Sequence, residues 1–170
     1  MKTSIKFLIL ALSVAFISSC IEDPDDDTPP RTEAQELSQL AVYIDTLNNR
    51  GLDVDTTELG VYYIIDSLAD GVYPVPGDTC IVKYEGYTLE GYMFDASARH
   101  STDGTYEFIL ENPPMIEGWD DGMRVINEGS SAHLIIPSSL AYGSIGAYPA
   151  IAPYQTLIFY IEMVEIKQAY

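Results

Sequence analysis

The sequence predicts an α+β fold, in which an antiparallel sheet wraps one short helix and a further helix precedes the sheet. Three observations support this prediction. Residues 32–50 have helical spacing, β-rich runs separated by glycine and proline follow from Gly60 onward, and only Ile116–Ile126 has helical spacing within that later region. A group of strands with one isolated helix is typical of the α+β class, whereas strands and helices alternate regularly in the α/β class.

Residues 32–50 are predicted to form an amphipathic helix. Thr32, with Gln35 three positions later, is a helix start signal, and Gly51 is a stop signal. The apolar stripe is narrow, so the helix is expected to pack against a neighbour, either its own domain or a second copy of the chain. Its apolar residues recur at threes and fours, at Leu37, Leu40, Ala41, Ile44 and Leu47.

The β-rich runs are predicted as strands because β-branched and aromatic residues dominate them and turn residues separate them. In the longest clear alternation, Cys80, Val82 and Tyr84 are expected on one face of the sheet. The predicted strands are residues 61–65, 79–87, 92–94, 105–110, 132–136 and 157–163.

Ile116–Ile126 is predicted as the short helix beneath the sheet. Trp119, Met123 and Ile126 fall on one side of it, whereas Asp120 lies near the positive N-terminal end, where an acid is favourable. The indole and its two apolar neighbours are therefore expected to face the sheet.

Residues 137–153 are predicted as a long loop rich in Gly, Ala, Pro and Tyr. A loop of this length without its own secondary structure is uncommon in a compact domain and is often functional. Its apolar side chains need a surface to cover, and the helix that carries Trp119 is the expected surface. These side chains are Tyr142, Ile145, Tyr148 and Ile151.

The first twenty residues are typical of a bacterial lipoprotein signal. Lys2 and Lys6 precede an apolar run, Phe7–Ile17, that is too short to span a bilayer comfortably. The Ile-Ser-Ser-Cys sequence that ends at Cys20 resembles a lipobox, which implies cleavage before Cys20 and acylation of this residue. The alternative is an ordinary secretory signal in which Cys20 has no special role.

An acidic, proline-containing stretch follows Cys20 and is predicted to be a disordered tether, because it cannot bury enough apolar surface to fold. A solvated tether is one interpretation. The other is a sorting signal, since acids directly after a lipidated cysteine resemble the surface-export signals of Bacteroides-type lipoproteins. The acids are Glu22, Asp23, Asp25, Asp26 and Asp27.

The formal net charge is −18 at pH 7. Residues 1–19 contain two lysines and no acid, so the chain without them has a net charge of −20. Such a charge repels phosphate backbones and anionic lipid headgroups. Nucleic acid is therefore excluded as a partner, and contact with a membrane is expected only through a lipid anchor.

The chain has two cysteines, and acylation of Cys20 would leave no pair for an intramolecular disulfide. Cys80 lies in the alternating apolar pattern of a strand. It is therefore predicted to be a buried and inert thiol.

Three short strings, at Phe94–Asp95, Ile116–Gly122 and Leu140–Ser144, predict a pocket for an apolar cyclic group. They supply one Trp, further apolar residues and carboxylates, but no obvious nucleophile, phosphate loop or metal cluster. His100 and His133 are expected to be exposed and too far apart to form a metal site, and no cofactor is expected. Taken alone, the aromatic residues are better interpreted as core, and Asp95 as a turn or cap residue.

Residues 60–168 resemble the FKBP-type peptidyl-prolyl cis-trans isomerases. The match runs in order through residues 77–97, 106–123 and 129–166. The resemblance implies a curved five- or six-stranded antiparallel sheet wrapped around one short helix. The expected organisation is a lipoprotein signal peptide (1–19), an acidic tether (20–31), a helical extension (32–58) and an isomerase domain (59–170).

The resemblance also implies a role for each pocket residue. Trp119 would be the floor under a proline ring, and Asp95 the single buried carboxylate, held by Tyr84. Ile116, through its N–H, and Tyr142, through its hydroxyl, would donate hydrogen bonds to the substrate. The implied catalytic residues are Phe94, Asp95, Trp119 and Tyr142, and the implied substrate-binding residues are Tyr84, Tyr106, Met115, Ile116, Ile151 and Phe159.

Some positions depart from the family pattern. Met115 stands where the family usually has Val, and Tyr106 stands at the rim where Phe is usual. The segment between Asp95 and Tyr106 is slightly longer than usual, and Arg99 is the expected basic partner of Asp95. These changes affect the rim more than the floor.

The activity implied by the resemblance is acceleration of X–Pro isomerisation in exported or envelope proteins, without a cofactor. Macrolide inhibitors of the FKBP class are implied as further ligands. The expected location is the cell envelope, lipid-anchored to the outer membrane and either periplasmic or surface-exposed. Two alternatives stay open: a non-catalytic chaperone or binding module that uses the same pocket, and an interaction protein that forms a homodimer through residues 32–50.

Overall fold

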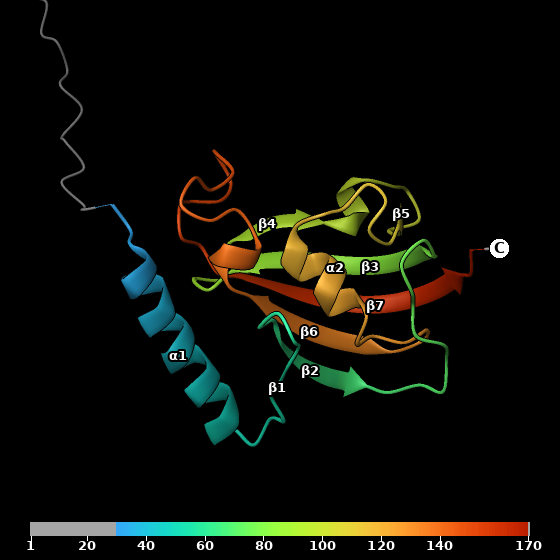
Figure 1. Ribbon diagram of the computed structural model, residues 1–170, viewed down its shortest axis with the longest axis horizontal. Helices are drawn as coiled ribbons and strands as arrows, with labels where there is room; N and C mark the ends of the chain where they lie inside the picture. The colour runs from blue at the N-terminus through green and yellow to red at the C-terminus, as the bar shows by residue number, and fades with distance from the viewer. Residues whose placement is uncertain (1–29, 170) are drawn as a thin grey trace, which may run out of the picture.

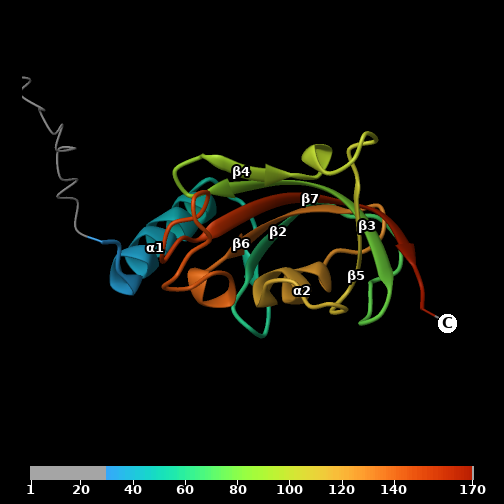
Figure 2. The ribbon, with the colours of Figure 1, turned by 90° about the horizontal axis from the view of Figure 1, so that it is seen from above.

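The computed structural model describes residues 30–169. Within this range a curved antiparallel sheet surrounds the short helix α2 (Glu117–Met123), and a longer helix, α1 (Glu33–Asn49), lies at one end of the sheet (Figure 1). Seen from above, α2 occupies the hollow of the curve (Figure 2). The predicted α+β class is therefore confirmed. The predicted signal peptide, Cys20 and the acidic residues 22–27 lie outside the described residues.

Seven strands are found in residues 30–169, one or two more than expected, because a two-residue strand, β1, is added at one edge. The order across the sheet is β1-β2-β6-β7-β3-β4, and β5 pairs with the other part of β3. The strands are β1 (Asp55–Thr56), β2 (Tyr62–Ser67), β3 (Thr79–Thr88), β4 (Met93–Ala96), β5 (Tyr106–Ile109), β6 (Ser131–Ile136) and β7 (Leu157–Lys167).

The two long central strands, β3 and β7, pair along their whole length, from Thr79 opposite Lys167 to Thr88 opposite Leu157. Side chains alternate between the two faces of a strand. Cys80 and Val82 accordingly lie in the core on the concave face, as predicted, and Lys83 is exposed on the other face. Burial raises the pKa of the Cys80 thiol to about 12, with a further contribution from Asp78, so this thiol is protonated at neutral pH.

Trp119 and Met123 of α2, and Ile126 just after the helix, are buried, as predicted. The helix is shorter than the predicted span of 116–126. After Met123 the hydrogen bonds follow the 3₁₀ pattern, since the N–H groups of Val125 and Ile126 donate to carbonyls three residues earlier. This change to the narrower turn ends the α-helix.

Two glycines bring α2 close to β6. A Cβ atom on Gly118 would lie 2.3 Å from Cγ2 of Ile136, and one on Gly122 would lie 2.4 Å from Cδ1 of Leu134. No side chain can occupy these positions without moving a neighbour. The absence of side chains therefore sets the distance between the helix and the sheet.

The predicted start of α1 is confirmed, since Thr32 and Gln35 form a reciprocal capping box. At the other end, Gly51 has φ of +80°, which glycine adopts at little cost. The helix packs on its own domain, against the convex face of the sheet. The contact between α1 and the sheet forms a second apolar cluster, separate from the core on the concave face, with Leu40, Leu47, Ile64, Ile135 and Ile158.

One part of the predicted apolar stripe of α1 was wrong. Leu37, which is 52% exposed, and Ala41 lie on the exposed side of the helix, whereas Glu36 is buried. The buried side of the helix therefore begins at an acid, which finds hydrogen-bond partners that the chain pattern does not reveal.

In residues 30–169 no helix combines the length and apolar character needed to cross a membrane.

The glycine contacts of α2 generate a prediction about stability. Gly118→Ala is expected to destabilise the protein by about 1–3 kcal/mol, the usual effect of overpacking a core, even though alanine favours helix by about 1 kcal/mol. Gly122→Ala should cost less, because it meets only the flexible end of Leu134. Urea unfolding of both variants and the wild type measures the difference. A Gly118→Ala protein as stable as the wild type, or more stable than Gly122→Ala, would contradict this packing argument.

Candidate functional site

A cavity of about 100 Å³ lies between α2, the sheet and the loop that follows β6. The structure brings together nine of the ten pocket residues expected from the sequence. They are Tyr84, Phe94, Asp95, Tyr106, Met115, Ile116, Trp119, Tyr142 and Phe159. The tenth, Ile151, does not line the cavity but is buried in the same apolar core.

Trp119 is held in place by aromatic rings that meet it edge-on. The ring centroids of Phe159, Tyr84 and Phe108 lie 5.0, 5.3 and 5.7 Å from the indole. Edge-to-face contacts at such distances stabilise a pair beyond simple burial, by about 0.5–1.5 kcal/mol. The floor of the cavity is therefore a rigid apolar surface.

Gly86 makes room for the walls of the cavity and was not singled out from the sequence. It lies on β3 opposite Phe159 of β7 and Asp95 of β4. A Cβ atom at Gly86 would lie 2.7 Å from the ring of Phe94 and 3.0 Å from that of Phe159. A glycine inside a strand often marks such a close approach, which is the signal that could have identified it.

Asp95 is the polar centre of the cavity. Its carboxylate accepts hydrogen bonds from the hydroxyl of Tyr84 (2.7 Å) and from the N–H of Ala96 (2.8 Å). The expectation of a single buried carboxylate was wrong. The side chain of Asp95 is 34% exposed, and other acids within residues 30–169 are more deeply buried, namely Glu36, Asp78 and Asp120.

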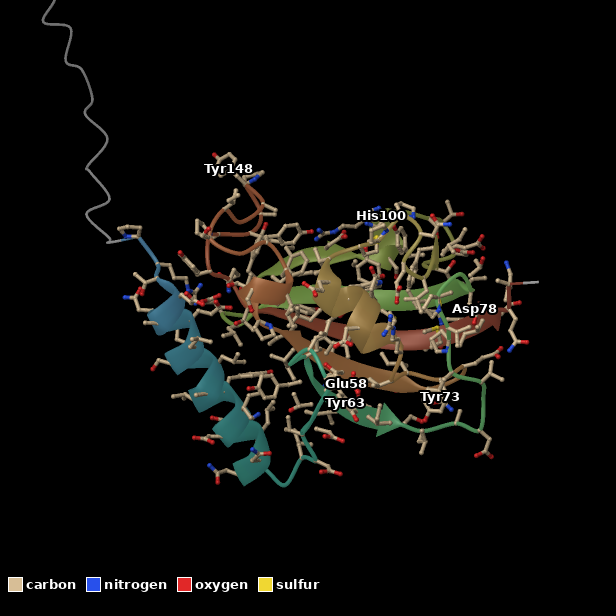
Figure 3. All side chains as sticks on the ribbon, in the orientation of Figure 1. Glu58, Tyr63, Tyr73, Asp78, His100 and Tyr148 are labelled. Atoms are coloured by element: carbon tan, nitrogen blue, oxygen red, sulfur yellow. The ribbon has the colours of Figure 1, made fainter. Side chains whose placement is uncertain are left out.

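The basic partner of Asp95 is His100, not Arg99. The Nε2 atom of His100 lies 2.9 and 3.1 Å from the two carboxylate oxygens of Asp95. Arg99 instead donates to the backbone carbonyl of Phe94 at 2.8 Å. Residues Ser97–Arg99 form a turn of 3₁₀ helix, η1, which carries the chain round so that His100 reaches the cavity. His100 is partly exposed, as expected (Figure 3). Its ring centroid lies 5.6 Å from that of Tyr106, at the rim of the cavity.

The pKa of Asp95 is lowered. Burial raises this pKa, but the hydrogen bonds from Tyr84, the Ala96 N–H and His100 together outweigh that effect. The pKa of Tyr84 is strongly raised, first by burial and then by its hydrogen bond to Asp95. At neutral pH the pair is therefore a carboxylate and a neutral phenol that donates to it.

Hydrogen-bond donors lie at the mouth of the cavity. The phenol of Tyr142 has a raised pKa, through burial and the nearby charge of Asp95, so its hydroxyl keeps its proton. Ile116 is the N-cap residue of α2, and the N–H of such a residue is not used by the helix itself. Asp120 holds the adjacent rim, because its carboxylate accepts from the N–H of Met115 at 2.8 Å. Burial raises the pKa of Asp120.

The loop after β6 is more ordered than the predicted structureless segment. It begins with a turn of 3₁₀ helix, η2 (Ser138–Leu140), and contains an antiparallel bridge between Ala147 and Ile151. The expectation that all its apolar residues cover α2 was wrong. Ile145 is 85% exposed. Tyr148, at the tip of the loop, is 96% exposed (Figure 3).

His133 was predicted to be exposed, but it is half-buried on the convex face. Its Nε2 atom lies 3.2 Å from Oδ2 of Asp66, and its ring packs edge-on against Tyr160 at 4.2 Å. Burial lowers the pKa of His133, and Asp66 opposes this effect. The residue belongs to the outer surface of the sheet.

A larger depression, of about 430 Å³, lies on the convex face near His133 and is lined partly by Asp66, Lys83 and Glu162. Among its charged residues, Lys83 pairs with Glu162 at 3.2 Å, and Asp66 pairs with His133. The smaller concave-face cavity combines an apolar floor with polar groups that converge on it, which is typical of ligand sites.

Among residues 30–169 no group of three or more possible metal ligands lies close together.

Comparisons with known proteins connect this geometry with a family. The sequence profile described as "FKBP-type peptidyl-prolyl cis-trans isomerase" matches residues 71–164. A protein named a probable FKBP-type peptidyl-prolyl cis-trans isomerase FkpA, from Neisseria meningitidis serogroup B, is 37% identical over 113 residues, or 66% of this chain. Escherichia coli FkpA is 34% identical over 116 residues, or 68% of this chain. The chain matches only 40% and 41% of the lengths of these two relatives.

Solved structures agree with the sequence relatives. The crystal structure of Escherichia coli FkpA matches with a TM-score of 0.66 at 30% identity, covering 81% of this chain and 63% of that one. A peptidyl-prolyl cis-trans isomerase from Pseudomonas syringae pv. tomato matches with a TM-score of 0.70 at 27% identity, covering 83% and 99%. The profile match spans the strands and helix that enclose the cavity. The chain therefore belongs to the FKBP-type peptidyl-prolyl cis-trans isomerase family.

Proposed function

We propose that the protein is a peptidyl-prolyl cis-trans isomerase that acts on X–Pro bonds of exported or envelope proteins. The observation that carries this proposal is the small cavity floored by Trp119, with the Asp95–Tyr84 pair at its side. The cavity offers an apolar floor for one ring and polar groups beside it. None of the nine described residues that line it is an activated nucleophile, and bond rotation needs none.

The reaction requires no proton transfer or covalent intermediate. Rotation about a peptide bond has a barrier of about 18–20 kcal/mol, and an unassisted X–Pro bond isomerises in tens to hundreds of seconds. Water stabilises the planar, charge-separated form of the amide. A proline ring seated on Trp119 is removed from water, which weakens the double-bond character that resists rotation.

The rim then favours the twisted amide over either planar isomer. In this proposal Ile116, through its N–H, and Tyr142, through its hydroxyl, bind substrate carbonyls on either side of the rotating bond. Asp95 directs its negative charge towards the twisted amide. Donors and charges fixed before the reaction lower the barrier, because they bind the transition state more tightly than the ground state.

A second candidate is a chaperone or binding module that uses the same cavity without catalysis. The exposed Ile145 and Tyr148 favour it, since they offer apolar contact for a flexible polypeptide beyond the cavity. The two functions are compatible, because both begin with capture of an apolar, proline-containing segment. Macrolides of the FKBP class are proposed as inhibitors of either.

The organisation of the chain is part of the proposal. We infer a signal peptide (1–19), a tether (20–31), a helical extension (32–58) and an isomerase domain (59–170), with a lipid on Cys20 and a location at the outer membrane. A homodimer through residues 32–50 would have to use the exposed side of α1, where Leu37 and Val42 lie, because Leu40 and Leu47 are buried in the same chain.

The catalytic proposal predicts that the purified protein accelerates isomerisation of an X–Pro peptide in a protease-coupled assay. Asp95→Val and Trp119→Ala should each lower kcat/KM by about a hundredfold to a thousandfold, the range seen when one transition-state contact is lost. Asp66→Val is the matched control, because it removes a carboxylate from the convex face. No acceleration by the wild type, or full activity in either folded site variant, would leave the binding module as the better proposal.

The lowered pKa of Asp95 predicts the pH dependence. Activity should be constant near neutrality and fall as the pH drops through this lowered pKa. The sign for stability is the same. A folded-state pKa below the unfolded value means that the contribution of Asp95 is present above the unfolded pKa and lost on acidification.

Tyr84→Phe provides the test, because it removes one hydrogen bond that lowers the pKa of Asp95. The fall in activity should move to higher pH, and the NMR titration of the Asp95 carboxyl carbon should move with it. If neither the pH at which activity falls nor the NMR titration midpoint moves, the loss of activity at low pH is not due to protonation of Asp95.

The anchor proposal predicts that cells expressing the protein incorporate labelled palmitate into it and that Cys20→Ala abolishes the label. Cys80→Ala is the control, and it should keep the label, since this thiol is buried in a strand. Label that survives in Cys20→Ala contradicts the proposed anchor. Protease treatment of intact cells then distinguishes a surface location from a periplasmic one.

A further inference from the structure

Glu36 of α1 is the most deeply buried charged residue in residues 30–169, with 1% of its surface exposed. It is far in sequence from the cavity, and the proposed reaction does not use it. Its carboxylate contacts the segment of residues 137–156, here called the pocket loop, which carries Tyr142. A buried carboxylate is stable only when its oxygens have good partners.

Both ends of the pocket loop donate to this one carboxylate. At the first end, Ser138 donates from its backbone N–H to Oε1 at 2.6 Å and from its hydroxyl to Oε2. At the other end, the hydroxyl of Thr156 donates to Oε1 at 2.7 Å. Glu36 thus connects the two points where the loop leaves β6 and enters β7.

The contact continues from Ser138 to the cavity. The backbone carbonyl of Ser138 accepts hydrogen bonds from the N–H groups of Ala141 (2.9 Å) and Gly143 (2.8 Å). These two residues flank Tyr142, so the position of Ser138 fixes the backbone on both sides of that tyrosine. Leu140, in the same turn, packs beside Gly118 of α2, next to Trp119.

A second contact joins the N-terminal end of α1 to the same loop. Arg31 donates to the side chain of Gln155 and forms an ion pair with Glu90 at 2.8 Å. Gln155 in turn donates to Glu90 at 2.9 Å. The helix and the residue that precedes its cap therefore contact the loop at Ser138, Gln155 and Thr156.

We propose that α1 is a positioning element of the prolyl site and that Glu36 is its key residue. By joining the ends of the pocket loop, Glu36 places the hydroxyl of Tyr142 at the mouth of the cavity. This inference rests on the proposed isomerase function for its effect on rate. Glu36 acts through Ser138 and does not touch the substrate.

The test compares three variants of the full protein in the isomerase assay. Glu36→Ala should lower kcat/KM roughly tenfold, mainly through kcat, because a displaced donor is lost most in the transition state. Glu36→Gln should restore most of the activity, since an amide oxygen still accepts from Ser138 and Thr156. Asp45→Ala removes an exposed carboxylate from the same helix and should leave the activity unchanged. Equal activity of Glu36→Ala and the wild type would overturn the proposal.

Amide hydrogen exchange provides a readout that is independent of catalysis. Exchange in residues 137–156 should become faster in Glu36→Ala, whereas exchange in β3 and β7 should stay as in the wild type. Thr156→Val, which removes one end of the contact, should give the same local change and serves if Glu36→Ala does not fold. Unchanged exchange in the loop of a folded variant overturns the proposal. An inactive wild type would overturn only the isomerase function.

Discussion

The approach of α2 to the concave face of the sheet is the contact on which the rest of the site depends. Gly118 and Gly122 allow the helix to lie against Ile136 and Leu134 without an intervening side chain. Trp119, between them in sequence, is thereby held at a fixed depth among the rings that surround it. Since protein interiors are close-packed, a change in this distance would alter the cavity floor, the rim at Met115 and the loop that packs on the helix together.

The polar groups of the cavity are arranged around one partly exposed carboxylate. Asp95 is held by the phenol of Tyr84, a backbone N–H and His100, and these contacts keep it ionised despite partial burial. A fixed charge next to an apolar floor can bias the shape of a bound amide without entering into bonds with it. In our proposal the reaction consists only of rotation about one bond, for which such a charge and an apolar floor are suited.

The convex face of the sheet carries a second set of interactions that reach the same site from outside. Leu40 and Leu47 attach α1 to the sheet through apolar contact, and Glu36 adds directed hydrogen bonds to both ends of the pocket loop. Apolar contact holds the helix in place but specifies direction weakly, whereas a buried carboxylate with its donors fixes one geometry. In our proposal α1 thus contributes to the order of the pocket loop.

Local patterns in the sequence were enough to predict the α+β class, the strand faces and the helix start at Thr32, because alternation, helical spacing and turn residues act between near neighbours in the chain. The set of residues that gather around Trp119 was implied by the resemblance to the family and not by these patterns. Apart from the Tyr84–Asp95 pair, which the family resemblance implied, tertiary structure decided which polar groups distant in the chain meet. In the folded chain His100, and not the expected Arg99, lies beside Asp95. Ile145 and Tyr148 are exposed, and α1 buries Glu36 whereas Leu37 faces solvent. The contacts of Glu36 join residues more than a hundred positions apart. Such contacts depend on where whole strands and helices come to lie, and no short-range pattern in the chain encodes that position.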